Sequence, residues 1–570
     1  MGDHILGNLG SLTTIYWVGN DGFELVKHNF SGGLPLFIEI DTIFNKIDLT
    51  FSRFRNYINK NSIVIFALAF AALCTYGFEL FNFNITIDEE IHASYPGIVS
   101  DWVPMGRWGM YLLNRLLFPH TTVIPFVPLF FGLVFHVGAI LLMLSAWNVK
   151  LIKDQILVGF IGITFPTMAY MYSFSIINYG IGFGYFCIGL SLFVYAKNNN
   201  RARFVSILPA ALAIAIYPGF IPALVSAFLI FLINKWIGKK NISKDEIFDV
   251  SGIIIGAIIL YFIIHKSINL IVTVPLTYNV SQYFNIDHLL NDFSSVLIKT
   301  LGTAKQAYLG EKTIYAISIT SLTYLLGLSL IGLGINLFGL KTSSINKTIL
   351  ALLSVSLLFL PFAAGLLMRG IIQPRFMLAL PIVCMGIILL GINKNRLFQV
   401  ALVLFSTLVF IQFITATNHL FASSHLALQS DRLVASQLIE RIESAKAEVG
   451  TTNVNYLEVV GYYSRPSTLL IPKTGTIGAS FFEWDQGNIY RVVAFLRTLG
   501  YEDLVPLPVE RRIKLIDLAN SMPVWPEKGS VKIIEDIVLV KFGPYSYRQK
   551  LLLCQPVSSQ AIVRDSDFCK

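Results

Sequence analysis

Long apolar stretches, separated by short polar segments, recur along the chain from Ser62 to Thr417. An α-helix needs about 20 apolar residues to cross the hydrocarbon core of a bilayer. The pattern therefore predicts a polytopic α-helical membrane protein. The predicted spans are Ser62–Phe81, Thr121–Ala146, Asp154–Tyr172, Asn178–Ala196, Phe204–Trp236, Val250–Val272, Thr313–Phe338, Thr348–Met368, Phe376–Ile392 and Leu397–Thr417.

One of these stretches, Phe204–Trp236, is too long for a single untilted span. Tyr217, Pro218 and Gly219 interrupt it, and proline breaks a helix because it lacks a backbone N–H and its ring clashes with the preceding turn. We therefore predict two short helices there, which makes about eleven transmembrane helices in all.

The placement of basic residues supports this division. With two helices there, six basic segments fall on one face of the membrane, as expected for the cytoplasmic face. They are Arg53–Lys60, Lys150–Lys153, Lys197–Arg203, Lys235–Lys244, Lys341–Lys347 and Lys394–Arg396. The N-terminus is then cytoplasmic. Three large segments are predicted on the outer side: residues 82–120, residues 273–312 and everything after Asn418.

The pattern divides the chain into three parts. Residues 1–60 are predicted to form a cytoplasmic segment that contains no cleavable signal peptide. Within this segment, Leu34–Tyr57 is predicted to be amphipathic. Residues 61–417 form the predicted transmembrane domain. Residues 418–570 change to a soluble pattern, which predicts a C-terminal mixed α/β domain on the outer side of the membrane; the resemblance described below implies that this side is the periplasm. Its predicted elements are a helix at Ser430–Val449 and strands at Val454–Val460 and Ile533–Lys541.

Composition agrees with a membrane protein and limits the function classes. Of the 570 residues 55% are hydrophobic and 14% charged, against about 25% charged in soluble domains. The formal net charge of +9 is explained by basic residues that hold loops in the cytoplasm. No basic stretch alternates with aromatic residues, so we expect membrane lipid and no nucleic acid as a partner.

Three consecutive carboxylates, Asp88, Glu89 and Glu90, follow the first predicted span after a few residues. Neighbouring like charges and partial burial both raise the pKa of a carboxyl group, so one of the three can act as a general base near neutral pH. A solvated acidic loop is the alternative. Their position at the membrane surface favours catalysis on a lipid-linked substrate.

Asp101, Trp102, Arg107 and Trp108 form a second cluster in the same outer segment. Tryptophan is common at membrane interfaces, which explains the two indoles without a specific function. The functional alternative is a sugar stacked on Trp102 or Trp108, with the guanidinium of Arg107 on phosphate oxygens.

Arg369 and Arg375 lie in a short outer loop, against the tendency of basic residues to stay in the cytoplasm. A polyprenyl phosphate head group at the outer leaflet would explain them, and snorkelling to the interface is the alternative. Cys554 and Cys569 lie in the polar tail and can form a disulfide in an oxidising compartment. No His and carboxylate spacing suggests a metal, and we expect no cofactor.

These motifs together resemble the bacterial serotype-converting O-antigen glucosyltransferases, which are similar to the GT-C class of membrane glycosyltransferases. The resemblance rests on the acidic residues after the first span, on Gly106, Arg107 and Trp108, on the outer-loop arginines, and on the run GASFFEWDQGN at residues 478–488. It covers most of the chain from Ser62 onward and leaves residues 1–60 out.

The resemblance implies a reaction and its partners. Undecaprenyl phosphate glucose would be the donor and a sugar hydroxyl of lipid-linked O-antigen the acceptor, with inversion at the anomeric carbon on the periplasmic face of the bacterial inner membrane. Other proteins would make and flip the donor. A lipid-linked glycan transporter and an O-antigen polymerase are the alternatives.

The resemblance also implies roles for residues. Asp88, followed by Glu89, is the expected general base, and Arg369 and Arg375, with Arg107, are expected on the donor phosphate. From the chemistry of their side chains, seven residues are the expected contacts of the acceptor sugar: Glu90, Asp101, Trp102, Trp108, Trp484, Asp485 and Asn488. For the last three, an ordinary turn with a buried tryptophan is the alternative, and Glu90 and Asp101 stay open as the base.

Overall fold

The structure is a computed structural model that divides into two compact units, Met1–Asn56 and Tyr57–Lys570. It describes residues 16–17, 23–24, 52, 56, 59–95, 100–119, 123–197, 201–239, 243–271, 291–393, 395–451, 453–464 and 475–554. In the first unit, β1 (Tyr16–Trp17) pairs antiparallel with β2 (Phe23–Glu24). The predicted amphipathic piece Leu34–Tyr57 lies almost entirely outside the described residues.

Apolar helices dominate the second unit. Within the described ranges, nine helical segments are long and apolar enough to cross a membrane, and two shorter apolar helices accompany them. The long segments are α2 (Ser62–Phe81), α5 (Val127–Ala146), α6 (Ile152–Thr164) continued by η2 (Pro166–Met168) and α7 (Ala169–Tyr172), α8 (Asn178–Lys197), α10 (Ile221–Lys239), α11 (Lys244–Ile271), α15 (Thr320–Phe338), α16 (Ser344–Phe359) continued by η6 (Leu360–Phe362) and α17 (Ala363–Leu367), and α19 (Arg396–Val449). The short helices are α9 (Ile207–Ile216) and α18 (Leu380–Gly391).

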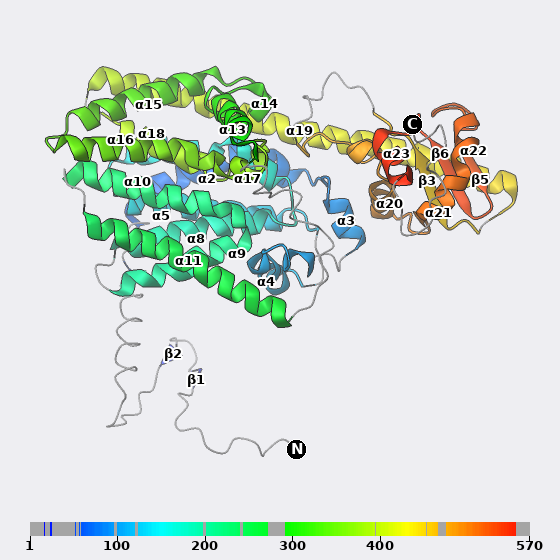
Figure 1. The fold of residues 1–570 in the computed structure, drawn as a ribbon, viewed down its shortest axis with the longest axis horizontal. Helices are drawn as coiled ribbons and strands as arrows, with labels where there is room; N and C mark the ends of the chain where they lie inside the picture. The colour runs from blue at the N-terminus through cyan, green and yellow to red at the C-terminus, as the bar shows by residue number, and fades with distance from the viewer. Residues whose placement is uncertain are drawn as a thin grey trace, which may run out of the picture. The chain divides into compact units, whose positions relative to one another are not determined.

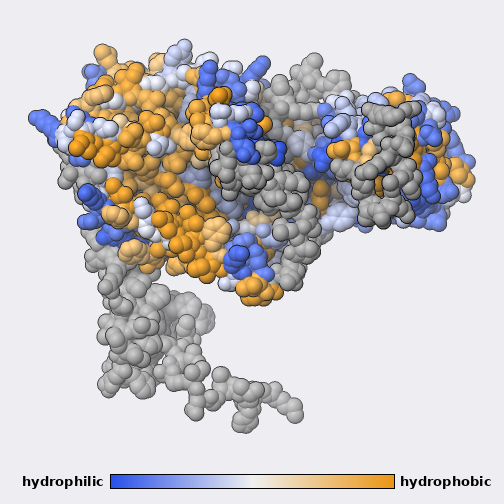
Figure 2. Space-filling model, in the orientation of Figure 1, coloured by the Kyte–Doolittle hydropathy of each residue, from blue (hydrophilic) through white to orange (hydrophobic). Residues whose placement is uncertain are grey.

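The surface of these helices is apolar on the face that Figure 2 shows, whereas hydrophilic side chains are frequent over the C-terminal elements. Phe66 of α2 and Phe262 of α11 are among the exposed large side chains, at 74% and 52%. Contiguous apolar surface of this kind is normal where lipid replaces water. The prediction of a helical membrane protein is confirmed, while the count of eleven spans stays a prediction.

The break predicted inside Phe204–Trp236 is present. Helix α9 ends at Ile216, Tyr217 is extended with φ −154° and ψ 114°, and a short turn η4 (Pro218–Phe220) leads into α10. A residue before proline is pushed out of the helical region by the proline ring, which explains the position of the break.

The boundary predicted after Thr417 does not interrupt the helix. Helix α19 runs without a break from Arg396 to Val449, so the predicted span Leu397–Thr417 and the predicted helix Ser430–Val449 are parts of one element (Figure 1). Asn395 caps its start, and Gly450, with φ 69°, ends it.

The C-terminal elements surround a small sheet with the strand order β4 (Val505–Pro506), β3 (Tyr456–Val460), β6 (Ile537–Lys541) and β5 (Val531–Ile534). Strand β3 pairs parallel with β4 and β6, and β5 pairs antiparallel with β6. The single strand predicted at Ile533–Lys541 is therefore wrong, because the chain turns at Glu535, where φ is 54°. The helices here are η8 (Trp484–Gln486), α20 (Ile489–Thr498), α21 (Val509–Arg512), η9 (Ile513–Leu515), α22 (Ile516–Ser521) and α23 (Tyr547–Cys554).

The remaining described helices are short and lie between the apolar ones. They are α3 (Glu89–Ser94), α4 (Trp108–Leu117), η3 (Arg201–Ser206), α13 (Phe293–Tyr308), α14 (Lys312–Tyr315) and η7 (Pro374–Phe376). Helix α4 lies in the first segment predicted on the outer side, residues 82–120. Of the outer segment predicted at 273–312, residues 273–290 lie outside the described part of the chain.

One hydrophobic core connects the first outer segment with the C-terminal elements. It contains Leu438 and Ile442 of α19, Val538 of β6 and Phe495 of α20, together with Ile87, which is 1% exposed. Ile87 directly precedes the acidic residues. Its burial therefore anchors the acidic loop against the C-terminal part of the chain.

Candidate active site

Asp88 is the first of the three acidic residues in the candidate site. It precedes α3 and has φ 87°, a left-handed conformation that Asp tolerates better than most residues. Its side chain is 45% exposed, and Oδ1 accepts a hydrogen bond from Nη2 of Arg491 at 2.7 Å. Among the described residues no donor reaches Oδ2. Asp88 therefore keeps one carboxylate oxygen available to a substrate.

Glu89 has the opposite surroundings, because it is fully buried. Its Oε2 accepts hydrogen bonds from the backbone N–H and the hydroxyl of Thr86 at 2.8 and 2.9 Å. Its Oε1 accepts from the backbone N–H and hydroxyl of Ser175 at 2.5 and 2.6 Å and from the N–H of Ile176 at 3.3 Å. Burial raises the pKa of Glu89 and these donors oppose the rise. With both oxygens occupied, Glu89 ties the acidic loop to the turn before α8.

Glu90 is also fully buried, and its Oε1 accepts a hydrogen bond from Nη1 of Arg491 at 2.6 Å. Burial raises the pKa of Glu90 to about 7, although the charge of Arg491 acts in the other direction. Glu90 therefore changes its charge near neutral pH at a contact with the C-terminal part of the chain.

Arg491 of α20 is the residue that joins the two parts of the site. Its guanidinium makes ion pairs with Asp88, with Glu90 and, through Nε at 3.2 Å, with Asp485. Burial disfavours its charge, but the carboxylates of Asp88 and Glu90 outweigh this and raise the pKa of Arg491. The sequence analysis missed Arg491. The only signal in the sequence is its position three residues after the run 478–488.

Arg107 and Arg375 lie at the two ends of an aromatic stack. The guanidinium of Arg107 lies 4.5 Å from the ring centre of Tyr217, Tyr217 stacks on Phe376 at 6.4 Å, and the guanidinium of Arg375 lies 5.2 Å from the ring of Phe376. Within the described ranges no carboxylate forms an ion pair with either arginine, or with exposed Arg369. The structure thus brings the first outer segment, the break before α10 and the arginine loop together.

The other aromatic residues of the first outer segment are covered. Trp102 and Trp108 are 4% and 7% exposed, so neither offers a free indole face in this structure. His92 lies against Trp102 with ring centres 5.6 Å apart, and burial lowers the pKa of His92 to about 4, although the charges of Asp88 and Asp101 oppose this. Sugar binding by Asp101, Trp102 and Trp108 stays a prediction.

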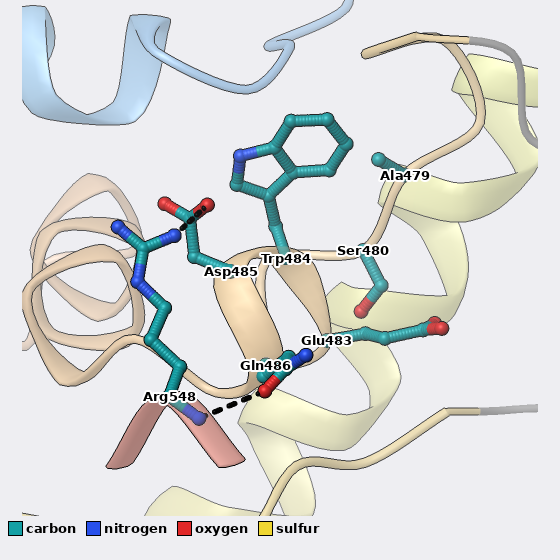
Figure 3. Close-up of a pocket in the computed structure, with 7 residues that line it drawn as sticks. All are labelled: Ala479, Ser480, Glu483, Trp484, Asp485, Gln486 and Arg548. Atoms are coloured by element: carbon teal, nitrogen blue, oxygen red, sulfur yellow. Dashed lines mark hydrogen bonds and ion pairs between the residues drawn. The ribbon is translucent and has the colours of Figure 1, made fainter. Parts of the chain in front are cut away.

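A cavity of about 330 Å³ lies among the C-terminal elements, with Trp484 and Asp485 in its wall (Figure 3). The lining residues are Ala479, Ser480, Glu483, Trp484, Asp485, Gln486 and Arg548. Asn488 does not line it. Its Oδ1 accepts a hydrogen bond from the N–H of Tyr490 at 3.1 Å, so this side chain caps α20.

The sequence analysis also missed Glu79, which lies inside the first predicted span. It is 9% exposed, and no hydrogen-bond donor among the described residues reaches its buried Oε2. Glu79 lines a cavity of about 20 Å³ with Asn84, Ser173 and Asn178, each of which also carries a buried polar atom without a partner. A carboxylate inside an apolar span is itself a signal of function, and it was present in the sequence.

Two further expectations concern cysteine and metal. Cys554 ends α23 and is disulfide-bonded, but Cys569 lies outside the described residues, so their pairing stays a prediction. In the described part of the chain, no group of three or more His, Cys, Asp and Glu side chains could hold a metal ion.

The fold and the site define a helical membrane protein with an acidic loop after the apolar helix α2. Arg107 in the same outer segment, and Arg369 and Arg375 in the loop before α18, have no acidic partner among the described residues. Residues 77–435 match the family model described as glucosyl transferase GtrII, so the chain belongs to this family of glucosyltransferases. The expected relation to the serotype-converting O-antigen glucosyltransferases is thereby confirmed. A search of curated proteins finds no match.

Proposed function

We propose that this protein transfers glucose from undecaprenyl phosphate glucose to a sugar hydroxyl of lipid-linked O-antigen, with inversion, on the periplasmic face of the bacterial inner membrane. One observation carries the proposal most directly: on the loop that follows α2, the side chain of Asp88 is 45% exposed, and no donor among the described residues reaches its Oδ2. The family match supports the glucosyl group.

Asp88 is the general base in this proposal. The acceptor hydroxyl gives its proton to Oδ2 of Asp88 while its oxygen attacks the anomeric carbon from the side opposite to the phosphate. The bond between the anomeric carbon and the phosphate oxygen breaks, and the electron pair leaves with undecaprenyl phosphate. Glu89 is a poor candidate because five hydrogen bonds already occupy its two oxygens.

The arginines stabilise the leaving group. Arg107 and Arg375 have no acidic partner among the described residues, and guanidinium groups bind phosphate oxygens through paired hydrogen bonds. Their attraction grows as negative charge moves onto the departing phosphate, which lowers the barrier. Exposed Arg369 lies in the same loop as Arg375 and contributes to capture of the anionic head group.

Localisation follows from the positive-inside rule, which puts the N-terminus in the cytoplasm and the acidic loop, the arginine loop and the C-terminal elements outside. The donor then reaches the site from the outer leaflet. Proteins that make the donor and move it across the membrane are the expected functional partners.

The full-length protein in detergent, mixed with radiolabelled undecaprenyl phosphate glucose and lipid-linked O-antigen, tests the proposal. We expect label to enter the acceptor glycan with a β-linkage if the donor is α-linked, and the reverse for a β-linked donor. Absence of transfer from every polyprenyl phosphate sugar tested would sink the proposal.

Two variants assign the roles. Asp88→Asn should reduce transfer by a factor of about 10² or more, the usual contribution of a general base, with unchanged donor binding. Arg375→Ala should weaken donor binding, and Arg396→Ala at the other end of the apolar helices is its matched control. Equal donor affinities for the two Arg variants would remove Arg375 from the phosphate site.

A further inference from the structure

The cavity among the C-terminal elements has the size and lining of a site for a small ligand. Its volume of about 330 Å³ is within the range of ligand pockets, which starts at about 300 Å³. Figure 3 shows the indole of Trp484 at one side, with Asp485 and Arg548 facing each other across from Glu483. The family match ends at residue 435, so it assigns nothing to this cavity.

The charges of the lining disfavour an anionic ligand. Glu483 and Asp485 contribute two negative charges and Arg548 one positive charge, which leaves a net charge of −1. Arg548 already donates to Oδ1 of Asp485 through Nη1 at 2.6 Å. A phosphate group would meet repulsion here, in contrast to Arg107 and Arg375, which have no acidic partner among the described residues.

The chemistry of the lining fits a sugar ring. The indole of Trp484 can pack on the C–H face of a pyranose, while the hydroxyl of Ser480, the amide of Gln486 and the carboxylates can exchange hydrogen bonds with ring hydroxyls. Mixed donors and acceptors around one aromatic face distinguish a sugar site from an apolar pocket.

The backbone of the cavity wall is held in an unusual conformation. Asp485 and Gln486 have φ 56° and 58°, and such non-glycine residues persist only where their surroundings fix them. The hydroxyl of Ser546 donates to the carbonyl of Gln486 at 2.8 Å, and the side chain of Gln549 donates to that of Gly487 at 3.0 Å. Strain maintained in this way is typical of a binding site.

A series of ion pairs connects the wall of the cavity with Asp88, the proposed base. Asp485 accepts from Arg548 on one oxygen and from Nε of Arg491 on the other, and Arg491 binds Asp88 and Glu90 at 2.7 and 2.6 Å. A ligand that hydrogen-bonds to Asp485 therefore lies next to the ion-pair network of the acidic loop.

We propose that this cavity binds one neutral sugar ring of the acceptor glycan and so presents the neighbouring hydroxyl to Asp88. The inference rests on the proposed function, since it names the acceptor subsite of the same reaction. Trp484 supplies the packing face, and Asp485 and Arg548 orient the ring.

The kinetic test uses Trp484→Ala and Arg548→Ala in the full chain. Arg548 is 54% exposed, so its removal leaves the fold intact even if Trp484→Ala lowers stability. We expect both variants to raise the KM for lipid-linked acceptor at least tenfold, with the KM for donor unchanged. The control is Tyr490→Ala, which changes an exposed aromatic residue of α20 outside the cavity. This variant should behave like the unmodified protein.

The outcomes separate the two proposals. Normal transfer with an unchanged acceptor KM in both variants overturns the sugar site and leaves the glucosyltransferase proposal standing. If the unmodified protein transfers no sugar from any donor tested, the proposed function fails instead. In that case saturation-transfer NMR with methyl hexosides and methyl 6-deoxyhexosides still decides about the cavity: loss of the signal in both variants supports a sugar site, and an unchanged signal overturns it.

Discussion

Asp88 and Glu89 are neighbours in the sequence, but folding gives their carboxylates different tasks. Asp88 is half exposed with one oxygen free, whereas Glu89 is buried with every acceptor position used. The sequence analysis left the choice between them open, because no sequence pattern reveals that Ser175 and Ile176 donate to Glu89. The site is therefore predictable as a cluster of acids but not as a set of roles.

Glu89→Gln should destabilise the protein. The amide would place its NH₂ group against donors of Thr86 or Ser175, and a buried donor left without an acceptor costs about 1–3 kcal/mol. The melting temperature in detergent should fall by several degrees. An unchanged melting temperature would contradict a structural role of Glu89.

Glu79→Gln should have the opposite outcome. Oε2 of Glu79 has no partner in the described part of the chain, and a neutral amide costs less to bury than a carboxylate. We expect a melting temperature equal to or above that of the unmodified protein. A fall as large as that for Glu89→Gln would mean that the carboxylate binds a cation or another partner in the folded protein.

The raised pKa of Glu90 predicts that the stability of the folded protein depends on pH. Its pKa is about 7 in the folded state and near the ordinary value of 4.5 after unfolding, so the folded state holds the proton more tightly. This contribution to stability is complete below pH 4.5 and is lost as the pH rises through 7, at about 1.4 kcal/mol per pKa unit. The stability advantage over Glu90→Gln should therefore shrink between pH 5 and pH 8 in parallel melts. A constant or growing difference would contradict the raised pKa.

At the scale of elements, the long apolar stretches predicted the apolar helices well. The span Ser62–Phe81 agrees with α2 at both ends, and the proline break before α10 was visible because proline acts locally. The continuity of α19 was missed because the sequence becomes polar after Asn418 while its helix-forming character persists. Residues 418–449 contain no glycine or proline, which was the available signal.

Close packing between helices depends on glycine where backbones touch. A Cβ on Gly182 of α8 would lie 2.0 Å from the carbonyl oxygen of Gly132 in α5. Gly182→Ala should therefore separate α5 and α8 and cost about 1–3 kcal/mol or more. The fraction of monodisperse protein and its melting temperature measure this.

Gly327→Ala in α15 is the matched control, because nothing lies within 4 Å of the added methyl group. Alanine also favours a helix over glycine, so this variant should be as stable as the unmodified protein or more so. Similar losses for the two variants would argue against a backbone contact between α5 and α8.

At the scale of the whole second unit, Arg491 joins two distant parts of the chain, because its partner Glu90 lies 401 residues earlier in the sequence. Contacts of this separation leave no trace in local patterns, which is why the sequence analysis found the acidic loop and the run 478–488 but not their connection. The small sheet was only partly predicted, because the turn between β5 and β6 has Glu535 in the left-handed conformation and no glycine or proline that would mark a turn in the sequence.

Arg491→Ala should lower both stability and transfer. Removing one partner of a buried ion pair costs about 3–5 kcal/mol because the other charge is left uncompensated. Arg497→Ala on the same helix, where the guanidinium lies over the ring of Tyr95 at 5.2 Å, should have a smaller effect.

The double variant Arg491→Ala with Glu90→Gln identifies the cause. It should recover part of the melting temperature, because the uncompensated carboxylate is gone, but not the rate of transfer. No recovery would place the loss outside the pair of Arg491 and Glu90.

The unbroken course of α19 constrains how such proteins can be recombined. Each residue added to or removed from an α-helix turns everything beyond it by about 100° and shifts it by about 1.5 Å. One extra residue in the polar half of α19 would swing Arg491 and the Trp484 cavity away from Asp88. Chimaeras that exchange the C-terminal part between relatives should therefore work only when the length of α19 is kept or changes by whole turns, about seven residues for two turns.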